Sequence, residues 1–348
     1  MCNIAGYVGT KRAAPILLEM LKREEGFDGG FYTGIATLHE GKIYYAKVVG
    51  DVDTLINEKA VQDLPGTIGI IHSRTPSGGG VKWAHPFVTQ KNGVVTHAYV
   101  ANGSSGVFKN RNDEYTRRTE QLLEQGYDMT SRDKGDCMRY QVMKDGSAVH
   151  MSDAMCQLIA YHIDAGKGIV EAMSAAFCEM PSEIVGLLLS LAEPNGIAYS
   201  RINMPMFVVF SEDGAYLSST PSAFVGETTE PHALAPCSSG IVYKDGFTVF
   251  PYQEPPARVG VIDAEIRSKA YESVCAALKE GEKSFPQIRK HIEATLFKDG
   301  DCFPAARLVY EILYWLQKQD KLQIRRDRLA VENVCDGFAA PKFWLSWK

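Results

Sequence analysis

The stretch MCNIAGYVG, residues 1–9, places a cysteine directly before a short apolar segment that is typical of a buried strand. Removal of Met1 would leave Cys2 carrying both a thiol and a free α-amine. An α-amine has an unperturbed pKa of about 7.7–8.0, so it can act as a general base toward its own thiol. The alternative interpretation is that Cys2 is a small apolar residue that begins a core strand, as free cysteines often are.

The composition describes an ordinary soluble globular protein. The chain has 348 residues, 45% hydrophobic and 23% charged, which is enough for two domains. A net charge of −5 argues against a protein that coats nucleic acid. The eight cysteines are dispersed without a CxxC pair, and there is neither a leader nor an apolar run of membrane length. We therefore expect reduced thiols, no membrane span and a cytoplasmic location.

Hydrophobic periodicity predicts strands in meanders and helices in clusters. A helix is expected over 11–24, where Ile16, Leu17, Met20 and Leu21 share one face. Strands are expected over 34–38, 43–48, 67–72, 94–100, 205–210, 215–219, 240–243 and 248–251. Further helices are expected from Ser152 onward and over about 168–191. This order favours a layered α+β fold with antiparallel sheets over a parallel doubly wound fold.

The proline-rich stretch 251–256 predicts a linker between two domains, at residues 1–252 and 258–348. Beyond it we expect helices over 262–279, 284–296 and 304–319, then a strand-turn-strand over 322–325 and 328–331. Three helices followed by a hairpin resemble a small winged-helix module. The segment 257–348 holds 16 Lys and Arg against 13 Asp and Glu, which is thin support for nucleic-acid binding. Packing or dimerisation through Phe343, Trp344 and Trp347 is the simpler expectation for this module.

Several short motifs follow one another in a specific order. They are residues 1–9, Ala14 to Glu19 (APILLE), Gly34-Ile35-Ala36, His72 to Gly79 (HSRTPSGG), Ala84-His85-Pro86 and Asn102-Gly103. Together they resemble the class II glutamine amidotransferases, which are N-terminal-nucleophile hydrolases, and in particular the glutaminase domain of glucosamine-6-phosphate synthase. The resemblance covers about residues 2–252. It implies a four-layer αββα sandwich and an enzyme that hydrolyses the glutamine side-chain amide to glutamate and ammonia.

The resemblance implies a role for each matching residue. Cys2 would be the nucleophile with its own amine as base, and Asn102 with Gly103 would form the oxyanion hole. The alternative for Asn102-Gly103 is a hairpin turn, which this dipeptide favours. Arg74 would hold the substrate α-carboxylate as a bidentate donor, and Ser77 stands where the family has a substrate-contacting threonine.

The partner of the substrate α-ammonium is less securely aligned. The segment between Asn102 and Asp153 is longer than the family usually has. Asp153 is our choice for the binding carboxylate, with Asp133 as a competitor. Asp153 also has the alternative role of a helix N-cap.

Three positions depart from the family. Its arginine near the nucleophile is replaced by Glu25 or Asp28, depending on the alignment, and an anion there would raise the thiol pKa. The tryptophan after the carboxylate-binding arginine is Thr75, and the histidine before the Asn-Gly pair is Ala101. These changes imply either a shifted specificity or an impaired relative.

Two functions follow as expectations. The first is an amidase acting on glutamine or a similar small amide through a Cys2 thioester, with the ammonia acceptor on a separate partner enzyme. The second is a catalytically impaired regulatory or amino-acid-sensing protein whose C-terminal module could bind DNA, although a nucleic-acid partner is the weaker expectation. We expect no cofactor and no metal, because His72, His85 and His97 lack ligand spacing. Homo-oligomer formation stays open.

Overall fold

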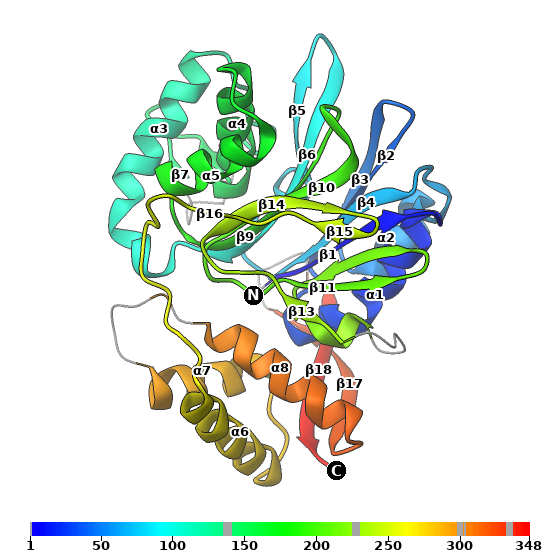
Figure 1. Cartoon of the computed structure of the whole chain (residues 1–348). Helices are drawn as coiled ribbons and strands as arrows, with labels where there is room; N and C mark the ends of the chain where they lie inside the picture. The colour runs from blue at the N-terminus through cyan, green and yellow to red at the C-terminus, as the bar shows by residue number, and fades with distance from the viewer. Residues whose placement is uncertain (1, 135–140, 225–229, 298–301, 303, 332–336) are drawn as a thin grey trace.

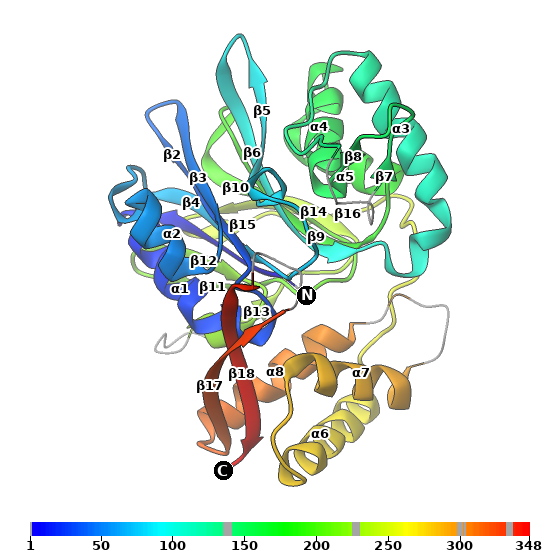
Figure 2. The same ribbon diagram turned by 180° about the vertical axis from the view of Figure 1, so that it is seen from behind.

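The computed structural model describes residues 2–134, 141–224, 230–297, 302, 304–331 and 337–348. It shows a layered body with a smaller C-terminal module packed beneath it (Figure 1, Figure 2). None of the described helices combines the length and apolar character that a membrane crossing requires.

The first sheet of the body runs in the order β13-β11-β12-β1-β4-β2-β3. Its strands are β1 (Asn3–Gly9), β2 (Tyr32–His39), β3 (Lys42–Val49), β4 (Ile68–Arg74), β11 (Phe207–Ser211), β12 (Gly214–Ser218) and β13 (His232–Ala233). Its neighbouring strands pair antiparallel.

The second sheet runs in the order β15-β14-β10-β9-β6-β5, with β16 also paired to β14. Its strands are β5 (Phe87–Lys91), β6 (Val94–Ser104), β9 (Glu183–Ser190), β10 (Glu193–Arg201), β14 (Ser238–Tyr243), β15 (Gly246–Phe247) and β16 (Phe250–Pro251). A separate small hairpin, β7 (Gln141–Val142) with β8 (Ala148–Val149), lies between the helices of this half.

Helices cover the outer face of each sheet, which gives the expected four-layer αββα sandwich (Figure 1). The first sheet carries α1 (Ala13–Asp28) and α2 (Val52–Lys59), and the second carries α4 (Met151–Asp164) and α5 (Ile169–Glu179), flanked by α3 (Asn112–Glu124). Short 3₁₀ turns are η1 (Val61–Asp63), η2 (Val81–Trp83), η3 (Gly106–Arg111) and η4 (Pro221–Phe224).

Strand β1 is buried on both faces, which explains its nearly continuous apolar sequence. Ile4 and Val8 point into the core between the sheets, whereas Ala5 and Tyr7 pack under α1. Antiparallel pairing with β12 on one side and β4 on the other fixes its position. Cys2 therefore directly precedes a central strand that is paired on both sides.

The expected helix over 168–191 is wrong in its second half. Helix α5 ends at Glu179, and residues Glu183–Ser190 form β9 between β6 and β10. Every residue of β9 after Glu183 is buried. A short apolar run that is buried on both faces has the same periodicity in a strand and in a core helix, and Pro181 marks where the helix has ended.

The C-terminal module contains α6 (Ala264–Lys279), α7 (Phe285–Leu296) and α8 (Ala305–Lys318), then a hairpin of β17 (Leu322–Ala330) and β18 (Ala339–Trp347). The expected short hairpin over 322–331 is wrong, because these residues form one strand paired with β18. Lys283, between α6 and α7, also bridges to Leu345 of β18. The winged-helix assignment and the domain boundary stay predictions.

Aromatic contacts join this module to the body. Phe27 at the end of α1 packs edge-on against Phe285, Tyr310 and Phe343, with ring centroids 6.2, 5.6 and 5.1 Å away. Gly26 lies directly under β18, where an added Cβ would come 2.3 Å from the Phe343 ring. This close approach is what requires a glycine inside α1.

Replacement of Gly26 by alanine should therefore destabilise the protein by about 1–3 kcal/mol, because the new methyl overpacks the Phe343 ring. Helix propensity alone predicts the opposite sign, a gain of about 1 kcal/mol. Denaturant unfolding of Gly26→Ala, Phe343→Leu and the double variant measures the coupling. A loss in the double variant that is smaller than the sum of the two single losses supports the contact. A stabilised Gly26→Ala would contradict it.

Candidate active site

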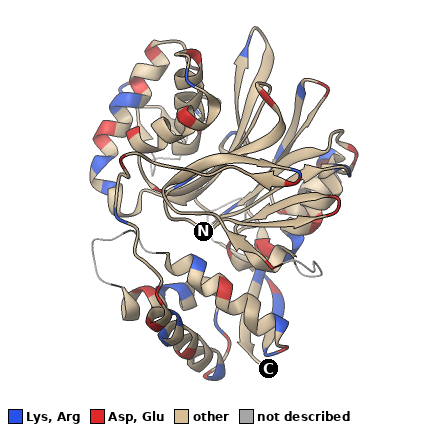
Figure 3. Cartoon of the chain, viewed as in Figure 1, with Lys and Arg blue, Asp and Glu red and all other residues tan. Residues whose placement is uncertain are grey.

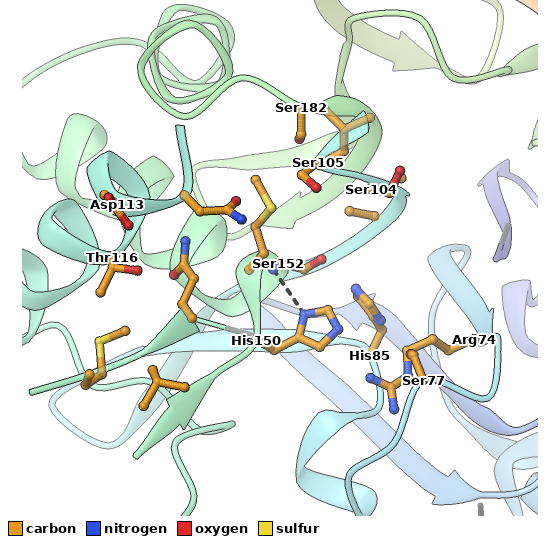
Figure 4. A pocket seen from close by; sticks show the side chains of 18 of the residues that line it. Arg74, Ser77, His85, Ser104, Ser105, Asp113, Thr116, His150, Ser152 and Ser182 are labelled. Atoms are coloured by element: carbon orange, nitrogen blue, oxygen red, sulfur yellow. Dashed lines mark hydrogen bonds between the residues drawn. The ribbon is translucent and has the colours of Figure 1, made fainter. Parts of the chain in front are cut away.

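Cys2 lines a cavity of about 1030 Å³ between the end of β6, α3 and the start of α4 (Figure 4). Its backbone nitrogen donates a hydrogen bond to Asn102 Oδ1 at 3.0 Å. The two residues come from different sheets and are 100 positions apart. The packing of the sandwich therefore brings the expected nucleophile to the expected oxyanion residue.

The hydrogen bond from Cys2 also orients the Asn102 amide. The side chain is fully buried, and its oxygen faces the Cys2 nitrogen. Its Nδ2 consequently points elsewhere and finds no hydrogen-bond partner among the described residues. A buried amide donor without a partner is costly and calls for an explanation, such as a ligand oxygen.

His72 holds the peptide that precedes Asn102. Its Nε2 lies 3.0 Å from the Ala101 carbonyl oxygen, which can only accept, so Nε2 carries the proton. Burial, aided by the Arg74 charge, lowers the pKa of His72 to about 3, so the ring is neutral. Ala101 stands where the family has a histidine. The hydrogen bond from His72 to the Ala101 carbonyl restrains the backbone that leads into Asn102.

Gly103 is required by close approach of the neighbouring strand. A Cβ at this position would lie 2.2 Å from the Glu183 carbonyl oxygen at the start of β9. Gly103 therefore sits at the end of β6, inside the sheet, and the hairpin-turn alternative for Asn102-Gly103 is wrong.

Arg74 ends β4 and is only 1% exposed, yet it also lines the cavity. Its guanidinium carbon lies 4.0 Å from the centre of the Tyr32 ring, on the paired position of β2. Nη2 donates to the Gly78 carbonyl, while Nε and Nη1 have no hydrogen-bond partner in the part of the chain that is described. Ser77 lies beside Arg74 in the cavity wall, as Figure 4 shows.

Asp153 does not reach this cavity. Its carboxylate is fully buried and accepts from the Ser131 backbone at 2.7 Å and from Thr130 Oγ1 at 3.3 Å. It is not the helix N-cap either, because His150 caps α4 by accepting from the Ser152 nitrogen at 3.1 Å. Asp133, the competitor, forms a bridge with Ala148 and lies outside the cavity lining. A role for either acid in ammonium binding stays a prediction without support from their positions.

The acidic residues at the end of α1 lie where α2 and the C-terminal module pack against that helix. Glu25 accepts from the Val52 nitrogen at 3.1 Å, and burial, with the charge of Asp51, raises its pKa to about 8. Asp28 faces the C-terminal module, where burial and then the charges of Asp28 and Glu24 raise the pKa of Tyr310. Glu25 thus has a hydrogen-bond partner in α2, and the effect of an anion near the thiol stays a prediction.

Sequence reasoning missed two parts of the cavity wall. His150 and His85 both line it, their rings 5.3 Å apart, and burial lowers the pKa of each. Gln141 and its hairpin form a second missed part. The extra length between Asn102 and Asp153 was the signal that could have located His150 and Gln141, whereas His85 was noted as part of the Ala84-His85-Pro86 motif without a role in the cavity. Within the described ranges, no group of His, Cys, Asp and Glu is arranged to hold a metal ion.

No family model matches the chain. The glutamine–fructose-6-phosphate aminotransferase (isomerizing) of Pyrococcus horikoshii is 26% identical over 293 residues, which cover 81% of this chain and 42% of that protein. The enzyme of the same name from Caldanaerobacter subterraneus subsp. tengcongensis is 28% identical over 306 residues, with 86% and 44% covered. The resemblance to the class II glutamine amidotransferases is confirmed. The chain spans less than half the length of these relatives.

Solved structures share the fold. The glutamine phosphoribosylpyrophosphate amidotransferase of B. subtilis superposes with a TM-score of 0.60 at 14% identity, covering 93% of this chain and 66% of that one. A structure described as the allosteric regulatory enzyme of purine biosynthesis gives 0.59 at 15%, covering 85% and 64%. The N-terminal-nucleophile hydrolase fold is therefore confirmed for this chain.

Among the described cysteines, Cys2 should be alkylated first at pH 7.5. Burial raises the pKa of Cys156, Cys178 and Cys237, which reduces their thiolate fractions, whereas Cys2 faces a cavity. A short iodoacetamide pulse followed by peptide mass mapping measures the order. Faster labelling of Cys178 or Cys237 than of Cys2 would contradict this assignment.

Proposed function

We propose that this protein is a glutamine amidotransferase-type amidase in which Cys2 attacks the side-chain amide of glutamine or a similar substrate. The hydrogen bond from the Cys2 nitrogen to Asn102 Oδ1 is the observation that carries the proposal. It orients the nucleophilic residue and, in the same contact, leaves Asn102 Nδ2 as a preorganised donor. An oxyanion needs donors that are fixed before the reaction begins.

The reaction requires removal of Met1. The freed α-amine would keep one N–H on Asn102 and present its lone pair to the thiol, from which it takes the proton. The thiolate then attacks the amide carbon, and the tetrahedral oxyanion forms hydrogen bonds with Asn102 Nδ2 and the Gly103 backbone N–H. The amine returns its proton to the leaving nitrogen, ammonia departs, and water hydrolyses the thioester to a carboxylate.

Arg74 would bind the substrate carboxylate. A planar carboxylate would bind the buried guanidinium bidentately through Nη2 together with Nε or Nη1, both of which lack partners in the described structure. Its present contact with the Gly78 carbonyl would be exchanged for the substrate. Stacking on Tyr32 limits the freedom of the guanidinium, so less entropy is lost on binding. Ser77 would contribute a hydroxyl at the same end.

The ammonia acceptor would be supplied by a separate partner. The described residues that line the cavity all lie within 2–184, and none of them comes from the C-terminal module. We therefore assign this chain the amide-hydrolysing half of a transfer reaction.

The DNA-binding alternative is not favoured by the module's contacts. Arg325 is paired with Glu282 and Asp327, and Arg328 with Asp51 at 2.7 Å. On the outer face of α8, Arg307 is paired with Glu311 and Lys318 with Glu230. Figure 3 shows positive and negative residues interspersed over the module. A regulatory role without DNA remains compatible with these contacts, but no observation favours it over catalysis.

Glutamate release from glutamine by Met1-processed protein tests the proposal. Cys2→Ala should abolish turnover, whereas Cys178→Ala, which removes a half-buried thiol outside the cavity, should retain it. Asn102→Ala should lower kcat by about 100–1000-fold through loss of one oxyanion donor. Asn195→Ala, an exposed asparagine on β10, is its matched control. Equal glutamate release by wild type and Cys2→Ala would reject the proposal.

A further inference from the structure

The cavity continues well beyond the residues that the amide chemistry uses. Past the start of α4 it is bounded by α3 and by β7, where Asn112, Thr116, Arg117 and Gln141 line it. Figure 4 shows Asp113 and Thr116 on the side opposite Arg74 and Ser77, with His150 and Ser152 between them. We call the part bounded by α3 and β7 the distal pocket.

The size of the whole cavity exceeds what free glutamine requires. Clefts that bury drug-sized ligands have volumes of about 300–1,000 Å³. The cavity here measures about 1030 Å³, at the upper end of that range. Glutamine is far smaller than such ligands, so with its amide at Cys2 and its carboxylate at Arg74 it would leave the distal pocket empty.

The middle of the cavity is poorly suited to a free ammonium group. The start of α4 presents His150, Met151 and Ser152, and burial lowers the pKa of His150 so that its ring is neutral. The Asp153 carboxylate is turned to Ser131 and Thr130. The described lining carboxylates, Asp113 and Glu120, both lie on α3. An uncharged amide nitrogen fits the middle better than a cation, which would lose water without gaining a carboxylate.

The distal pocket carries groups that recognise a peptide. Gln141 Oε1 accepts from Thr119 Oγ1 at 2.8 Å, which directs its Nε2 away from Thr119. That nitrogen is buried and has no hydrogen-bond partner among the residues described. A donor in this state is satisfied by a carbonyl oxygen. Asn112 and Thr116 add neutral polar groups, and the exposed Arg117 adds a cation at the rim.

We propose that the substrate is an α-N-acylated glutamine, specifically a short peptide with glutamine at its carboxyl end. The free carboxylate lies at Arg74, the side-chain amide at Cys2, and the preceding peptide group crosses the start of α4 into the distal pocket. Only the C–N bond of the side-chain amide breaks: ammonia leaves, water adds to the thioester, and the peptide ends in glutamate. This inference rests on the proposed function of Cys2.

The test compares alanyl-glutamine with free glutamine as substrates of the full-length protein after Met1 removal, with ammonia release as the readout. We expect kcat/KM for the dipeptide to exceed that for glutamine by about ten-fold or more, as one added hydrogen bond provides. Gln141→Ala should lower the ratio of the two kcat/KM values, and so should Asp113→Asn, because the α-ammonium of alanyl-glutamine enters the distal pocket that the Asp113 carboxylate lines. Lys109→Ala, which removes an exposed cation outside the cavity, should leave the ratio unchanged.

The outcomes separate the two proposals. Release of ammonia from glutamine but not from the dipeptide, or a ratio that neither Gln141→Ala nor Asp113→Asn lowers, overturns the peptide inference and leaves the amidase proposal standing. No release from either substrate, with Cys2 unlabelled by a glutamine-analogue electrophile, overturns both. Because Asp113 is exposed, its replacement tests the inference even if Gln141→Ala fails to fold.

Discussion

The site depends on one hydrogen bond between the two sheets, from the Cys2 nitrogen to Asn102 Oδ1 at 3.0 Å. Cys2 directly precedes β1, which pairs antiparallel on both sides, and Asn102 lies near the end of β6, where that strand pairs with β9. A register shift of one residue in either strand would turn the side chain of Cys2 or Asn102 to the opposite face of its sheet. Sheet register therefore sets the active-site geometry, and the core between the sheets maintains it.

The surroundings of Arg74 show how the fold accommodates a buried charge beside this pair. Its neighbours His72, His85 and His150 are neutral because burial lowers the pKa of each. The Tyr32 ring and the Gly78 carbonyl supply the favourable contacts that the described structure provides. A buried cation with only these contacts lowers the free energy of unfolding until an anion binds. The fold therefore accepts a cost in stability for a guanidinium that is already in position to bind a carboxylate.

The sequence allowed the local features to be predicted and left the tertiary ones open. The strand after Cys2, the Asn102-Gly103 pair and Arg74 at a strand end could be located because each is encoded by a short contiguous motif. Strand β9 could not, since a doubly buried strand and a core helix have the same apolar pattern. The turn of Asp153 toward Ser131 depends on an inserted segment whose path no local periodicity predicts.

The same distinction explains why the departures from the family do not by themselves imply loss of activity. Glu25 and Asp28 stand where a cation was expected, yet their surroundings are α2 and the C-terminal module. Gly26 and Phe27 on that same turn hold Phe343 of β18. The end of α1 is thus a packing surface for the module, and its acidic residues lie next to that interface. The Cys2–Asn102 hydrogen bond is present alongside these acidic residues.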